Sequence, residues 1–233
     1  MREFQMKPRL TEAEWLAATR LTGLDLYRSA WQQHRKYRLF GVACCRHAMP
    51  LAPDARLELL AASAEQFADG LVTWEGMKKF RRTITQVRKE LSEQFGPDEA
   101  KHAVLNALDR ATQQEPANAL GADQQAQFAF AAKSRPNFES GYRRAEQELI
   151  ILARDIFGNP FRTISFAESW RTGTAVSLAR TMYESRNFSP MPILADALQD
   201  AGCDNVAILD HCRDVNQPHV RGCWVVDLVL GKS

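Results

Sequence analysis

The chain has 233 residues, and its 30 lysines and arginines against 28 aspartates and glutamates leave a formal net charge of +2. Hydrophobic residues make up 45% of the chain and charged residues 25%. These values exclude a collagen-like chain, a low-complexity disordered chain and a strongly basic nucleic-acid tail. At roughly 100–200 residues per domain, the length fits one helical domain or two small ones.

The five cysteines are an odd number and two of them, Cys44 and Cys45, are adjacent, which is a poor basis for a secreted disulfide framework. The first ten residues do not resemble a signal peptide, and no run of residues approaches the 18 apolar positions of a membrane span. We therefore expect a reduced, cytoplasmic protein that is not associated with a membrane.

The first half of the chain has the pattern of successive helices. Thr11 and Glu14 have the spacing of a capping box directly before an apolar pair, so a helix is expected to begin there. Further on, apolar residues recur at steps of three and four, with prolines and glycines between the segments. The expected helices cover residues 35–48, 53–68, 73–95, 97–111 and 116–133.

Residues 134–137 contain a proline and separate an Ala/Gln-rich segment from an Ile/Leu-rich one, which favours a subdomain junction. The expected units are residues 1–135 and 136–233. In the second unit the pattern predicts a loop or one short strand at 161–166. Helices are expected at 142–156, 174–183, 192–201, 204–212 and 223–230. The predicted fold class is all-α, a multi-helix bundle of two packed helical subdomains.

Several segments carry a resemblance to a known family: Thr11–Leu16, Arg35–Phe40 with Cys44–Arg46, Asp155–Arg162, and Met191–Gly231. In these segments the chain resembles a paralogous family of proteins found in planctomycete bacteria. The last block is the most specific, with the sequence PILADAL, then DAGCD, HCR and HVRGCW. After His211–Arg213 the family usually has a Gly/Pro-rich link, whereas this chain has Asp214–Gln217. The resemblance supports the helix boundaries and implies no activity.

Cysteines and histidines form the first candidate site. If Pro218 opens a helix, His219 and Cys223 lie at i and i+4 on one face, which is a usable spacing for two zinc ligands. His211 or Cys212, and Cys44 or Cys45, could complete the set. Neighbouring residues on a helix point about 100° apart, so His211 and Cys212 are not expected to serve one metal together. The alternative is a set of reduced, buried cysteines with no cofactor.

Catalytic motifs are missing from the sequence. Cys203 precedes Asp204 near an expected helix start, where a thiolate could be favoured, but a helix stop followed by a cap explains that turn equally well. The chain lacks a nucleotide-binding glycine loop, a Gly-x-Ser-x-Gly segment and a His-Glu-x-x-His segment. An enzyme is therefore disfavoured.

One expected helix, between residues 77 and 90, is rich in basic side chains, and phosphate binding by that face is a second candidate function. Its apolar stripe faces the core and acidic residues flank it, so a solvated basic face is the alternative. The basic residues are Lys78, Lys79, Arg81, Arg82, Arg88 and Lys89.

Two structural predictions concern charged side chains. Asp227 is the only charge in an apolar run, so it needs a partner, and Arg46 or Arg162 are the first choices. Arg35, Arg38 and Arg46 flank an apolar seam, so at least one guanidinium should lie beside the core with its head paired. Replacing Arg38 with alanine should then lower stability more than a change at an exposed control such as Lys7.

By elimination, the leading function is a non-catalytic helical module for protein interaction or scaffolding, with another protein as its partner. A nucleic-acid-binding protein that uses the basic helix is the first alternative. A protein supported by zinc on cysteine and histidine ligands is the second.

Overall fold

The computed structural model describes residues 10–24, 33–114, 119 and 121–232, and within that part of the chain every regular element is helical. The all-α prediction is confirmed, and residues 161–166 form a loop. The helices are α1 (Glu12–Ala17), α2 (His34–Ala48), α3 (Ala55–Ala68), α4 (Trp74–Phe95), α5 (Glu99–Ala111), α7 (Gly121–Lys133), α8 (Phe138–Phe157), α9 (Gly173–Ser185), α10 (Met191–Asp200), α11 (Val206–Arg213) and α12 (Trp224–Leu230).

Local signals set most helix starts. Thr11 and Glu14 make the reciprocal hydrogen bonds of a capping box at α1. Asp54, Thr73 and Asp98 accept backbone N–H groups at the starts of α3, α4 and α5. These side chains satisfy donors that the first helical turn leaves unpaired.

Helix α2 is the centre of the larger group of helices, because it contacts α3, α5, α7 and α8. Its residues from Tyr37 to Cys45 are all buried, so both cysteines of that helix lie in the core. Gly41 allows a close approach, since a Cβ atom there would lie 2.7 Å from the Ala119 carbonyl oxygen.

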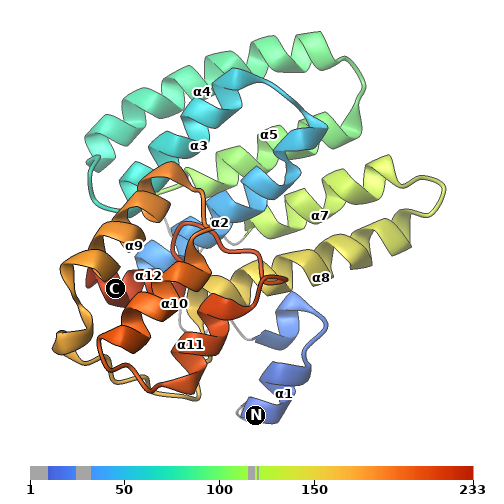
Figure 1. Ribbon diagram of the computed structural model, residues 1–233. Helices are drawn as coiled ribbons and strands as arrows, with labels where there is room; N and C mark the ends of the chain where they lie inside the picture. Colours follow the sequence, from blue (N-terminus) through green and yellow to red (C-terminus); the bar gives the residue numbers. More distant parts are fainter. Residues whose placement is uncertain (1–9, 25–32, 115–118, 120, 233) are drawn as a thin grey trace, which may run out of the picture.

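Buried apolar residues form two clusters. The first runs from Trp15 on α1 to Ile156 on α8, and the second from Ala175 on α9 to Val229 on α12. In Figure 1 the orange-to-red helices α9–α12 gather beside the blue-to-yellow ones. The division therefore falls after α8. The junction at residue 135 stays a prediction about domain organisation, while α8 packs on α7 and buries its apolar face in the first cluster.

None of the helices in the described ranges combines the length and the apolar character that crossing a bilayer requires.

Candidate metal centre

Four potential ligands meet where the two clusters join. They are Asp155, His211, His219 and Cys223, and their donor atoms all lie within 4.8 Å of one another. Asp155 Oδ1 is 2.8 Å from His219 Nδ1 and 3.2 Å from His211 Nε2. Cys223 Sγ is 3.2 Å from His211 Nε2 and 3.9 Å from His219 Nδ1.

The ligands come from α8, from α11 and from the segment between α11 and α12. Asp155 lies in the last turn of α8, where Gly158 ends the helix at a positive φ of 64°. His211 lies in the last turn of α11, and Cys223 is the residue before α12. The four side chains therefore join α8 of the first cluster to two helices of the second.

A tight turn at residues 220–223 places His219 and Cys223. The turn is closed by a hydrogen bond of 2.9 Å from the Cys223 N–H to the Val220 carbonyl. Gly222 adopts a φ of 96°, and a Cβ atom there would lie 2.9 Å from Leu39 Cδ1 on α2. Only glycine meets both conditions without strain. The Val220 N–H also donates to Asp155 Oδ2 at 2.9 Å, which fixes the carboxylate from its other side.

Pro218 does not open a helix, because the turn follows it, and α12 begins at Trp224, close to the expected start at residue 223. His219 and Cys223 still lie together, brought there by the turn rather than by helical spacing.

Burial and hydrogen bonding oppose each other at Asp155, whose side chain is fully buried. Burial raises the pKa of Asp155, but hydrogen bonds from His211 and His219 outweigh it, and the pKa is lowered overall. Asp155 is thus an ionised carboxylate. The pKa of the Cys223 thiol is raised far above its usual value by burial and, next, by the charge of Asp155.

The arrangement does not suit a cysteine nucleophile. Such a site needs an accessible thiolate and a base oriented by a third group through its other ring nitrogen. Here Cys223 is fully buried, and the same Nε2 atom of His211 faces both the thiol and the Asp155 carboxylate.

The arrangement does suit zinc. Bond lengths of about 2.0–2.3 Å in tetrahedral coordination place neighbouring N, O and S ligands roughly 3.3–3.6 Å apart. Four of the six separations between the donor atoms are 2.8–3.9 Å and all six are within 4.8 Å, so modest side-chain movements would complete the geometry. A carboxylate and a thiolate would also neutralise the two charges of the ion in this buried place.

The remaining predicted ligands lie elsewhere. Cys212 is buried and is not a member of the four-residue cluster, although it neighbours His211. Cys44 and Cys45 lie in α2 within the first cluster, where burial raises the pKa of each thiol. Cys203 is buried too, and burial raises the pKa of its thiol as well. Asp155 was not among the ligands predicted from the sequence. Its signal was a lone acid on the apolar face of α8, beside Leu152 and Ile156.

The basic residues of α4 do not form one free surface. Lys78 pairs with Glu75 on the same helix at 2.7 Å. Arg81 and Arg88 reach α5, where Arg81 pairs with Asp109. Lys79, Arg82 and Lys89 are exposed. Nucleic-acid binding stays a prediction.

Asp227 has an arginine partner, but it is Arg35, so the choice of Arg46 or Arg162 was wrong. Arg162 lies at the surface and bonds Glu12 at 2.6 Å, while Arg46 bonds Glu65 at 2.7 Å. Arg38 is 8% exposed and donates to the Gln113 carbonyl at 2.6 Å.

No protein-family model matches the chain, and comparisons with curated proteins and with solved structures found no similar protein.

Proposed function

We propose that this chain is a non-catalytic helical module supported by a structural zinc ion on Asp155, His211, His219 and Cys223. The observation that carries the proposal is the convergence of four donors of the types that zinc prefers, from α8, α11 and the turn before α12, within 4.8 Å. Four protein ligands fill a tetrahedral site. Because a catalytic zinc keeps one position for water or substrate, the set favours a structural role.

The position of the cluster supports that role. Asp155 lies on α8, whose apolar residues are part of the first cluster of buried residues, and Cys223 is a member of the second. A zinc ion there would tie the two clusters together. All four residues also lie in the segments that resemble the planctomycete family, and membership of that family is part of the proposal.

The five cysteines are all buried, free thiols. This state supports the proposal of a reducing compartment, where thiols persist. Another protein remains the proposed partner of the module.

Elemental analysis of protein purified without chelator tests the proposal. We expect about one zinc per chain, and a rise in melting temperature when zinc is returned to chelator-treated protein, because a ligand of the native state stabilises it. Cys223→Ser should weaken zinc affinity at least about tenfold, since even groups that only orient a ligand have effects of that size. Cys212→Ser is the matched control, since Cys212 is equally buried and outside the cluster.

Zinc-free wild-type protein whose melting temperature does not respond to added zinc would contradict the proposal. So would equal zinc content in the two serine variants.

A further inference from the structure

A second feature lies on the other side of His219. A cavity of about 250 Å³ opens between α2, α3, the end of α9 and the turn that carries Arg221. Three of its lining residues are arginines, Arg46, Arg186 and Arg221, and one is a carboxylate, Glu65. The cavity is smaller than the roughly 300–1,000 Å³ of a typical drug-sized ligand site, so it suits a small molecule.

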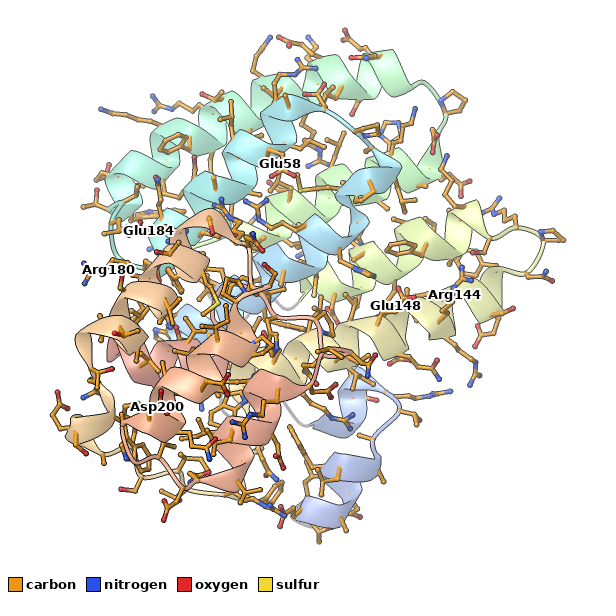
Figure 2. The ribbon with its side chains drawn as sticks, viewed as in Figure 1. Glu58, Arg144, Glu148, Arg180, Glu184 and Asp200 are labelled. Atoms are coloured by element: carbon orange, nitrogen blue, oxygen red, sulfur yellow. The ribbon has the colours of Figure 1, made fainter. Side chains whose placement is uncertain are left out.

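The cationic side chains outnumber the carboxylate in the cavity. Glu65 is 2% exposed, and it accepts hydrogen bonds from Arg46 at 2.7 Å and from Arg186 at 2.8 Å. Arg221 Nη1 lies 3.6 Å from the same carboxylate. Arg221 bonds Asp69 as well, and Arg46 bonds Glu58, an exposed residue labelled in Figure 2. Within the cavity itself, one carboxylate faces three guanidinium groups.

One of these guanidinium groups is incompletely paired. The Nη2 atom of Arg46 is buried and has no hydrogen-bond partner among the described residues. A buried donor of a charged group is costly when it is left unpaired. Because Nη2 itself has no accessible surface, the Arg46 side chain would have to turn for this donor to meet a ligand in the cavity.

Backbone strain marks a second guanidinium. Arg186 is the one non-glycine residue in the described ranges with a positive φ, at 59°. It ends α9 in the left-handed conformation, with its N–H on the Met182 carbonyl, where glycine is the usual residue. A long side chain kept in a strained conformation indicates that the side chain is needed there.

We propose that this cavity binds a small organic oxyanion. A carboxylate or phosphate group would lie against Arg46 and Arg186, because the planar fork of arginine matches both groups. The remaining walls are mostly apolar, with Leu39, Phe188 and Val220 among them. The preferred ligand is therefore an oxyanion that carries a short apolar group. Arg46 comes from α2 and Arg186 is the residue that ends α9, so neither belongs to the turn of the proposed zinc site, although His219 and Arg221 of that turn also line the cavity.

Titration calorimetry at constant ionic strength tests the proposal on the full chain. The probes are inorganic phosphate, phenyl phosphate, acetate and benzoate. We expect saturable binding of the two phosphates or of the two carboxylates. Phenyl phosphate should bind more tightly than inorganic phosphate, or benzoate more tightly than acetate. Comparison of the phosphates with the carboxylates shows which of the two anionic groups the cavity prefers.

Arg186→Gly is the informative variant, since it removes the guanidinium and suits the left-handed backbone. We expect it to fold and to lose at least tenfold in affinity for the probe that binds. Arg46→Gln should lose affinity to a similar degree and serves as the second variant. Arg180→Gln is the matched control, because Arg180 is exposed on the same helix and is labelled in Figure 2. The control should keep the wild-type affinity.

The proposal is overturned if none of the four probes binds saturably to the wild-type chain. It is also overturned if binding survives in both Arg186→Gly and Arg46→Gln.

Discussion

Arg35 and Asp227, which are 192 residues apart in the chain, form a two-point ion pair between α2 and α12, with nitrogen–oxygen distances of 2.7 and 2.8 Å. Their side chains are 13% and 2% exposed. Arg35 also bonds Asp69 at 2.9 Å and the Tyr183 hydroxyl at 2.7 Å. The boundary between the two apolar clusters is thus held by buried charges, and each of these charges needs its partner.

Asp227→Asn keeps the shape of the side chain and removes its charge, which leaves the Arg35 guanidinium half compensated. We expect the free energy of unfolding to fall by about 3–5 kcal/mol, the usual cost of breaking a buried pair from one side. Urea denaturation measures the change. The control is Asp196→Asn, because Asp196 pairs with Arg213 at the surface and is 69% exposed. The control should cost less than about 1 kcal/mol, and an equal cost for both variants would contradict the prediction.

The sequence predicts that Asp227 needs a partner, but it does not identify Arg35. A lone charge in an apolar run is visible locally, whereas the choice among arginines depends on how α2 and α12 pack. The helices themselves were predictable, since their periodicity and caps are local.

Of the four candidate metal ligands, some could be predicted from the sequence and one could not. The pairing of His219 and Cys223 was predicted from i, i+4 spacing on a helix, whereas a turn brings the two side chains together. Asp155 joins them through the packing of α8 on the C-terminal turn, which leaves no trace in residue spacing. The proline at residue 136 likewise marks a turn, but it does not show that the next helix, α8, buries its apolar residues in the first cluster.

Arg38→Ala should destabilise the protein more than Arg144→Ala. Arg38 lies over the Phe67 ring at 4.4 Å and donates to the Gln113 carbonyl, so its loss removes packing and a partly buried hydrogen bond. We expect a cost of about 2–3 kcal/mol, typical of a hydrogen bond to a charged group with added packing. Arg144, labelled in Figure 2, is exposed on α8 and serves as the control. The control named from the sequence, Lys7, lies outside the described residues. Equal melting temperatures would count against the prediction.

Gly222→Ala should disturb the turn that carries both His219 and Arg221. The added methyl group meets Leu39 at 2.9 Å, and a φ of 96° is unfavourable for alanine. We expect a loss of about 1–3 kcal/mol in unfolding free energy, together with weaker zinc binding. Gly173→Ala is the matched control, because a methyl group there meets no atom within 4 Å and its φ is not left-handed. A Gly222→Ala protein as stable as the control would refute this account of the turn.

The last prediction concerns Asp123 on α7, which is 7% exposed and whose Oδ1 has no hydrogen-bond partner in the described part of the chain. Burial raises the pKa of Asp123 to about 7 from its ordinary value of 3.8. Between these two values the folded protein binds a proton that the unfolded chain has released. The contribution of Asp123 to stability therefore falls as the pH rises from about 4 to 7, by at most about 4 kcal/mol at 1.36 kcal/mol per pH unit.

Asp123→Asn resembles the protonated carboxyl and should remove this dependence. Urea denaturation at pH 5 and pH 8 should show a larger gain in stability for the variant over the wild type at pH 8. Asp69 and Asp155 do not interfere, because the pKa of each is lowered. Burial raises both pKa values, but hydrogen bonds outweigh it. These come from Tyr183, Arg221 and Arg35 at Asp69, and from His211 and His219 at Asp155. Their contributions are complete above about pH 4 and are lost only in more acidic solution. A stability difference between variant and wild type that is the same at both pH values would show that Asp123 stays ionised in the folded protein.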